Sequence, residues 1–149
     1  MKNTPIFTGE YHHLLDFKRR LAIPVKFRST FHGKAVVTKG LDGCLFVYPT
    51  PVWEKLAEKL GSLPLGEKKM RQFVRLMLAG AIESDVDRQG RILIPNYLSE
   101  FAYLKKDVVI IGLYDRLEVW DNDEWGKSMN EAEKDKDNVA EELGRLGIY

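Results

Sequence analysis

One nine-residue pattern occurs twice in this chain, and the duplication constrains the fold more than any other feature. The segment "DFKRRLAIP" runs from Asp16 to Pro24, and "DRQGRILIP" runs from Asp87 to Pro95. Each copy contains an aspartate, three intervening residues, an arginine, an alternating apolar segment and a proline. A chain that carries the same unit twice is expected to fold as two related halves.

The duplication extends well beyond these nine residues. An offset of 71 positions pairs Arg20 with Arg91, and an offset of 72 further along the chain pairs Trp53 with Trp125. The repeated unit has about 50 residues, which is too few for a large core of its own. We therefore expect the two units to combine into one core within a single chain, as two subunits of a dimer would.

Local signals predict the same order of strands and turns in both units. Strands are expected at 7–14 and 81–85, which occupy equivalent positions in the two units. Turns are expected at 16–19 and 87–90, since aspartate favours turns and a glycine tolerates positive φ. A second short strand, a short helix and a pair of β-branched strands then follow in each unit.

The predicted helices are marked by their first residues. Pro24 and Pro95 suit the first position of short helices, because proline presets φ and needs no N–H there. Thr50 is predicted to cap the helix that closes the first unit, and Asp121 with Glu124 forms a capping-box pattern for the second. An additional helix at about 67–78 is expected to join the units after the "GSLPLG" linker.

These elements predict a mixed α+β, mainly β fold made of two pseudo-symmetric halves with flanking helices. We place the first half at 1–60, a linker and helix at 61–79, and the second half at 80–132. The acidic segment 133–149 is expected to form a C-terminal helix or tail.

Charge and composition narrow the class of protein. The net charge is only +1, but residues 1–40 hold 8 Lys/Arg against 2 Asp/Glu, and residues 115–149 hold 5 against 11. This asymmetry predicts one basic face and one acidic face. No apolar run is long enough to span a membrane, no signal peptide is recognisable, and the single Cys44 suits a reducing cytoplasm.

The repeated aspartate and arginine have two interpretations. An exposed pair across a turn is often a simple ion pair worth about 0–1 kcal/mol. Here, however, basic residues gather in both turns, and pseudo-twofold pairing would bring them to one side as a footprint for phosphates. Asp16 and Asp87 would then hold an arginine fork ready for guanine O6 and N7. The predicted DNA-binding residues are Lys18, Arg19, Arg20, Arg88 and Arg91.

Several segments in combination resemble the MraZ family of bacterial transcriptional regulators of the division and cell wall gene cluster, which are related to AbrB-type regulators. They are the two Asp-x-x-x-Arg units, "FTGEYHHLLD", "KGLDGCLFVYP", "AGAIESDVDRQGRILIP" and "RLEVW…EW". The resemblance implies a swapped-hairpin, AbrB-like β-barrel built from both halves. It also implies ring-shaped homo-oligomers that bind G-rich direct repeats in double-stranded DNA upstream of their own operon, with Arg20 and Arg91 on the DNA.

The leading hypothesis is thus a cytoplasmic, nucleoid-associated transcriptional regulator, with repression as its expected effect. The alternative is an antitoxin-like protein-interaction module of the AbrB fold group. Such modules usually carry one half followed by an acidic tail, whereas this chain has a full second half. We expect no catalytic residues, metal or cofactor, because no triad or metalloprotease pattern occurs and His12 and His13 would point to opposite faces of a strand. One departure from the repeat is Arg19, which stands where the second copy has Gly90.

Overall fold

The two units contribute four strands each to the computed structural model, which describes residues 6–148. The first unit supplies β1 (Phe7–Leu14), β2 (Arg20–Ala22), β3 (Lys34–Lys39) and β4 (Leu45–Pro49). The second unit supplies β5 (Ile82–Asp85), β6 (Arg91–Leu93), β7 (Asp107–Tyr114) and β8 (Arg116–Asp121). The predicted first strand of each unit is therefore confirmed to within one residue.

Helices follow the strands in each unit. They are η1 (Val25–Phe27, a 3-10 helix), α1 (Arg28–Phe31), α2 (Thr50–Gly61), α3 (Lys68–Ala79), α4 (Asn96–Phe101), α5 (Asn122–Lys134) and α6 (Lys136–Arg145). Pro24 and Pro95 lie one position before the first helical residue rather than at it. The helix between the units is confirmed as α3.

The two predicted caps have different outcomes. Asp121 caps α5 as expected, because its carboxylate accepts a hydrogen bond of 3.2 Å from the backbone N–H of Glu124. The prediction for Thr50 is wrong. Pro49 occupies the N-cap position of α2, so Thr50 is already helical, and its Oγ1 is buried without a hydrogen-bond partner among the described residues.

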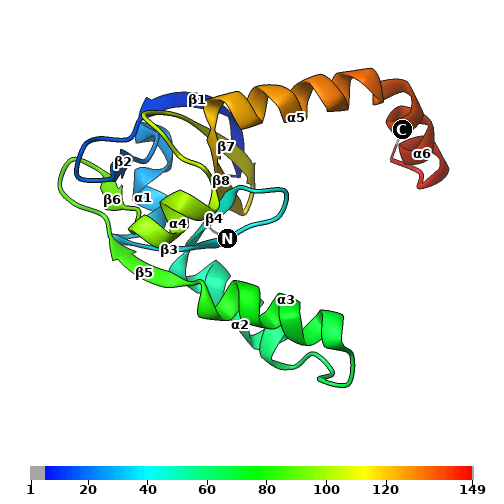
Figure 1. The fold of residues 1–149 in the computed structure, drawn as a ribbon, viewed down its shortest axis with the longest axis horizontal. Helices are drawn as coiled ribbons and strands as arrows, with labels where there is room; N and C mark the ends of the chain where they lie inside the picture. Colours follow the sequence, from blue (N-terminus) through cyan, green and yellow to red (C-terminus); the bar gives the residue numbers. More distant parts are fainter. Residues whose placement is uncertain (1–5, 149) are drawn as a thin grey trace, which may run out of the picture.

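The two units exchange their outer strands. The six-stranded antiparallel sheet has the order β1-β7-β8-β4-β3-β5, in which β1 pairs with β7 of the second unit and β5 pairs with β3 of the first. The central pair, β4 and β8, comes from equivalent positions of the two units. This order reads the same from both edges, as pseudo-twofold symmetry requires (Figure 1). Each unit pairs two of its own strands, β3 with β4 and β7 with β8, and places its outer strand beside the hairpin of the other unit.

The short strands β2 and β6 form a separate antiparallel ribbon, in which Leu21 lies opposite Ile92. Strands β1 and β5 remain the edges of the larger sheet, so the described residues form no closed barrel. The mixed, mainly β class with flanking helices is confirmed. The ribbon covers one face of the sheet, because Leu21 and Ile92 belong to the same core as the inward side chains of β3, β4, β7 and β8.

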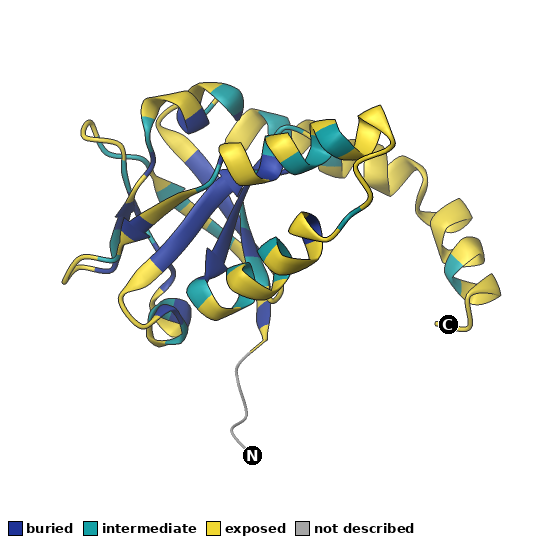
Figure 2. Cartoon of the chain, turned by 90° about the horizontal axis from the view of Figure 1, so that it is seen from below, coloured by how far each residue is buried: buried dark blue, intermediate teal, exposed yellow. Residues whose placement is uncertain are grey.

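The sheet is buried on both faces, as the alternation along β7 shows. Val108 and Ile110 pack into the core beneath the ribbon, whereas Val109 and Ile111 pack into a second cluster with residues of α2, α3 and α5. Successive residues of a strand point to opposite faces, so one apolar strand serves both cores. Figure 2 shows this buried centre and the exposed outer surfaces of the helices.

The C-terminal helices extend from this body. Helices α5 and α6 contain no buried residue, and α6 lies well away from the sheet (Figure 1). Within residues 6–148, no helix combines the length and apolar character needed to cross a bilayer.

Candidate nucleic-acid interface

Two turns lie at opposite ends of the short ribbon and on the same side of the molecule. The backbone N–H of Ile94 donates to the carbonyl of Arg19 (2.8 Å), and the N–H of Ile23 donates to the carbonyl of Gly90 (2.8 Å). These reciprocal bonds attach each turn to the strand of the other unit. We call the surface formed by residues 16–20 and 87–91 the cationic tip; it projects at the left of Figure 1.

The first turn is organised by one carboxylate. Asp16 Oδ1 accepts hydrogen bonds from the backbone N–H groups of Lys18 (2.9 Å) and Arg20 (2.8 Å), and Asp16 Oδ2 accepts from Arg20 Nε at 2.7 Å. These bonds, with that to the Arg20 backbone the strongest influence, hold the pKa of Asp16 below its usual range. Asp16 therefore closes the turn and orients the arginine at once.

The second turn repeats this geometry. Asp87 Oδ1 accepts from the N–H groups of Gln89 and Arg91, both at 2.9 Å, and Asp87 Oδ2 accepts from Arg91 Nε at 2.9 Å. The pKa of Asp87 is lowered for the same reasons, led by the backbone bond from Arg91. The predicted pairing of each aspartate with the arginine four residues later is present in both copies.

Each aspartate holds its arginine through Nε, which leaves the two Nη groups at the end of the side chain for other partners. Arg91 Nη1 also lies 3.8 Å from Asp16 Oδ2, so one carboxylate connects the arginines of both units. The side chains of Arg20 and Arg91 remain 32% and 28% exposed. A guanidinium fixed in this way can donate two parallel hydrogen bonds to an acceptor pair.

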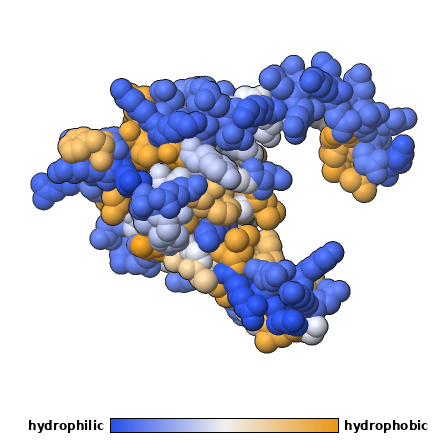
Figure 3. Space-filling view, viewed as in Figure 1, coloured by the Kyte–Doolittle hydropathy of each residue, from blue (hydrophilic) through white to orange (hydrophobic). Residues whose placement is uncertain are grey.

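The other predicted residues of the tip, Lys18, Arg19 and Arg88, are all exposed. Among the described residues, none of them forms an ion pair, whereas Arg20 and Arg91 are balanced by their aspartates. The tip therefore carries three uncompensated positive charges around two oriented guanidinium groups. Its outer surface is mostly hydrophilic in Figure 3.

The two turns share one backbone conformation despite their different sequences. Arg19 has φ 60° and Gly90 has φ 77°, so both occupy the left-handed region. The difference lies in the neighbouring short helix. A Cβ atom on Gly90 would stand 2.1 Å from Nε of Arg28, whereas the first turn faces Ser99, the counterpart of Arg28 at the offset of 71.

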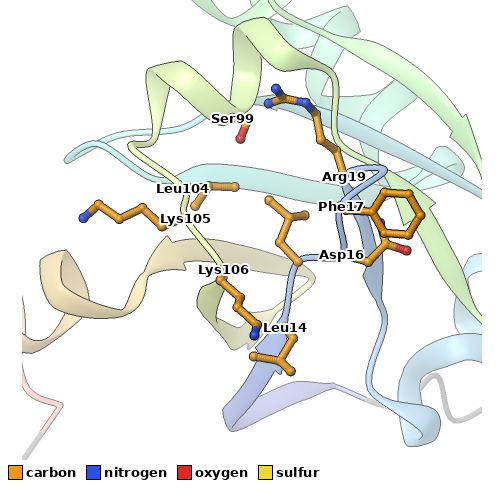
Figure 4. A pocket seen from close by; sticks show the side chains of 9 residues that line it. Leu14, Asp16, Phe17, Arg19, Ser99, Leu104, Lys105 and Lys106 are labelled. Atoms are coloured by element: carbon orange, nitrogen blue, oxygen red, sulfur yellow. The ribbon is translucent and has the colours of Figure 1, made fainter.

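At each of these two contacts between a turn and a short helix, a large residue therefore faces a small one. The large residue is in the turn at one contact and in the helix at the other. In the first, Arg19 extends from the turn toward the helix that carries Ser99 (Figure 4). In the second, the Arg28 side chain crosses the buried Gly90, and its Nε donates to the carbonyl of Ile23 at 2.8 Å. Each turn consequently has one additional guanidinium beside it.

Sequence reasoning missed Arg28 as a residue of this surface. Its role depends on the contact with Gly90, which lies 62 positions away in the chain. One signal was available: the second copy has glycine and serine, Gly90 and Ser99, where the first copy has the arginines Arg19 and Arg28. Reading both substitutions together would have indicated the exchange.

Other candidate groups do not assemble into a site. His12 bonds to Glu10 at 2.8 Å, and burial, followed by the charges of Arg28 and His12, lowers the pKa of His13. Cys44 is a buried free thiol whose pKa is raised by burial, in line with an inert role. Within residues 6–148, no three His, Cys, Asp or Glu side chains gather as metal ligands would.

The fold and the site define an internally duplicated protein in which two interlocked strand-turn-strand units present one cationic tip. Sequence comparison shows the same duplication. The family model described as "MraZ protein, putative antitoxin-like" matches the chain twice, at residues 6–76 and 77–145.

The similarity extends over nearly the whole chain. The transcriptional regulator MraZ of Halothermothrix orenii is 50% identical over 143 residues, which cover 96% of this chain and 100% of the relative. Proteins of the same name from Acetivibrio thermocellus and Clostridium beijerinckii are 48% and 47% identical over the same lengths. This chain belongs to the MraZ family.

Proposed function

We propose that this protein is a transcriptional regulator that binds double-stranded DNA through the cationic tip. One observation carries the proposal: two turns from different units converge, and in each turn an aspartate holds an arginine by its Nε. The names of the relatives support regulation of transcription, and the uncompensated charges of the tip suit a phosphate backbone.

The residues of the tip divide into two roles in this proposal. Arg20 and Arg91 contact guanine O6 and N7, because an oriented guanidinium fork matches that acceptor pair. Lys18, Arg19 and Arg88 bind phosphates, since their exposed side chains lack a partner that fixes their direction. Asp16 and Asp87 are positioning residues that act through the arginines.

Arg28 adds a sixth cation to this interface. Its Nε is bound to the Ile23 carbonyl, so its guanidinium stays beside the second turn. It thereby places a positive charge beside the second turn, as Arg19 does at the first. With Arg28 included, each turn has three basic side chains at or beside it, although Arg28 itself belongs to the first half.

We also propose that the observed strand exchange is the core of a swapped-hairpin, AbrB-like β-barrel. The reciprocal pairing of β1 with β7 and of β5 with β3 supports this interpretation, as does the pairing of β2 with β6. The division into halves at 1–60 and 80–132, with a linker at 61–79 and an acidic tail at 133–149, belongs to the same proposal.

Assembly into a ring that binds consecutive G-rich repeats is a further part of the proposal. Apolar side chains remain exposed on the helices outside the core, including Leu65, Met70 and Leu78 near or on α3 and Val139 and Leu146 on or after α6. Several tips in one ring would engage several repeats at once, which raises affinity without new contacts. Light scattering should show an oligomer at micromolar concentration, and a monomer alone would contradict this part.

The proposal also includes the location of the protein and its effect on transcription. We place the protein with the nucleoid in the cytoplasm, where it represses its own operon in the division and cell wall gene cluster. A reporter fused to the DNA upstream of its gene tests the sign of regulation. Deletion of the gene should raise expression, and a fall in expression would indicate activation.

The experiment for DNA binding is selection from a random duplex pool with the purified full-length protein. We expect enrichment of a short G-rich box in direct repeats, and no enrichment with the double variant Arg20→Ala, Arg91→Ala. Recovery of no enriched sequence by the unmodified protein would contradict the proposal. It would favour the alternative of a protein-interaction module.

A further inference from the structure

Phe17 is an unusual residue for the position that it occupies. It is 89% exposed, more than any other large hydrophobic side chain among the described residues. It is the second residue of the first turn, directly before Lys18, Arg19 and Arg20. A phenylalanine in water gains none of the free energy that burial would supply, so contact with a partner at this position would be favourable.

The backbone that carries Phe17 is fixed. The flanking Asp16 accepts hydrogen bonds from the N–H groups of Lys18 and Arg20 through its carboxylate, and from the N–H of Arg19 through its carbonyl at 2.9 Å. The ring therefore projects from a rigid turn. Lys18 Nζ lies 5.7 Å from the ring centroid, which keeps a cation beside the aromatic group.

The second turn differs at this position. The counterpart of Phe17 at the offset of 71 is Arg88, an exposed cation. The two turns hold their aspartates and arginines in the same geometry, yet one presents an aromatic ring and the other a charge. The pseudo-symmetric halves therefore present different surfaces to whatever the tip binds.

We propose that Phe17 contacts the 5-methyl group of a thymine in the major groove, beside the guanine that Arg20 contacts. This inference rests on the proposed function. The thymine methyl is the apolar group that the major groove exposes, and phenylalanine is among the side chains that contact it. Because the ring and the Arg20 guanidinium come from one tight turn, they reach neighbouring base pairs.

The surroundings of Phe17 favour DNA over a protein partner. Three consecutive cations follow the ring in the chain, and Lys105 and Lys106 line the pocket that it shares with Leu14, Leu15 and Leu104, whereas the centre of a protein interface is depleted in charge. In a DNA complex, by contrast, Lys18 and Arg19 bind phosphates, and the ring of Phe17 enters the major groove. In this arrangement the first turn reads both a guanine and a thymine, and the second turn reads guanine with an additional phosphate contact from Arg88.

The test removes a single methyl group from DNA. In the duplex enriched from the random pool, deoxyuridine replaces each thymine in turn, which leaves base pairing intact. For the unmodified protein, one such replacement next to the contacted guanine should weaken binding about four-fold, the size expected for one buried methyl group. Phe17→Ala should bind the thymine duplex more weakly and show no difference between thymine and deoxyuridine.

Two variants serve as controls. Phe17→Leu keeps an apolar side chain and should retain part of the preference for thymine. Arg88→Ala, at the equivalent position of the second turn, should weaken binding to both duplexes by the same factor. Phe17 and Arg88 are both exposed, so these substitutions leave the core intact, and circular dichroism checks that they do.

The outcomes separate this inference from the proposed function. Failure to enrich any duplex would overturn the proposed function and this inference with it. An enriched duplex without a thymine beside the contacted guanine would overturn only the role of Phe17. The same holds if deoxyuridine has no effect, or if Phe17→Ala keeps the full four-fold response.

Discussion

Replacement of Gly90 by alanine tests the exchange of residues that shapes the two turns. Gly90 has φ 77°, and an alanine in the left-handed region costs about 1–2 kcal/mol. Its Cβ would also stand 2.1 Å from Arg28 Nε, so the arginine must leave its position and lose its 2.8 Å hydrogen bond to the Ile23 carbonyl. Loss of such a charge-assisted bond costs about 1.5–3 kcal/mol.

Because Arg28 is half-buried, we expect the lower end of that range for the lost bond. Gly90→Ala should therefore lower the free energy of unfolding by about 3 kcal/mol in total. Gly43 provides the matched control, since its φ is 84° and a Cβ there would meet no atom within 4 Å. Gly43→Ala should show the backbone cost alone, about 1–2 kcal/mol.

Urea denaturation of the two single variants measures both costs. A double variant, Gly90→Ala with Arg28→Ala, removes the side chain that the new methyl group would displace. In the Arg28→Ala background, the effect of Gly90→Ala should shrink to that of Gly43→Ala. If Gly90→Ala costs no more than Gly43→Ala in the unmodified chain, or the same with and without Arg28, the proposed packing of Arg28 on this turn is wrong.

Three other predictions concern salt, pH and the attachment of α3. DNA affinity should fall steeply between dilute and physiological salt, and Lys18→Ala should reduce the slope of log K against log salt by about 1 per bound tip; an unchanged slope would remove Lys18 from the phosphate contacts. The folded-state pKa of His13 is lowered, so the unfolded chain binds the proton more readily. The free energy of unfolding should therefore decline as pH falls from about 6.5 towards that lowered pKa. Thermal unfolding of His13→Gln should show a flatter pH dependence, and a profile identical to that of the unmodified protein would contradict this cause. Thr38→Val should cost about 1–3 kcal/mol in urea denaturation, because the buried Thr38 Oγ1 donates to the Met77 carbonyl at 2.7 Å; a neutral effect would show that this bond does not hold α3 on the sheet.

The duplicated sequence predicted the parts of the structure that depend on local pattern. The strand and turn positions follow from alternation and from aspartate in turns, and the first strand begins at Phe7 as expected. Interlocking of the units could also be inferred, since a unit of this size buries too little apolar surface alone. The contact of Arg20 with Asp16 followed from their four-residue spacing across the turn.

Three features escaped prediction, and the last of them depends on a contact distant in sequence. Thr50 has the side chain of a cap, but Pro49 takes the N-cap position where β4 meets α2. Arg19 adopts the conformation of its glycine counterpart, because the hydrogen bonds of the Asp16 turn outweigh the cost of positive φ. The contact of Arg28 with Gly90 joins two units, and the spacing within either unit gives no indication of it.

The central claim, that Arg20 and Arg91 read guanine while the other cations bind phosphate, is tested most directly by comparing two duplexes. Affinity is measured for the enriched duplex and for a scrambled duplex of the same composition, with the unmodified protein, Arg20→Ala, Arg91→Ala and Arg19→Ala. We expect Arg20→Ala and Arg91→Ala to lose about 1–3 kcal/mol of discrimination per contacted guanine while binding the scrambled duplex nearly as before. Arg19→Ala should weaken both duplexes alike. If Arg20→Ala weakens both equally and Arg19→Ala alone abolishes the preference, the division of roles is wrong.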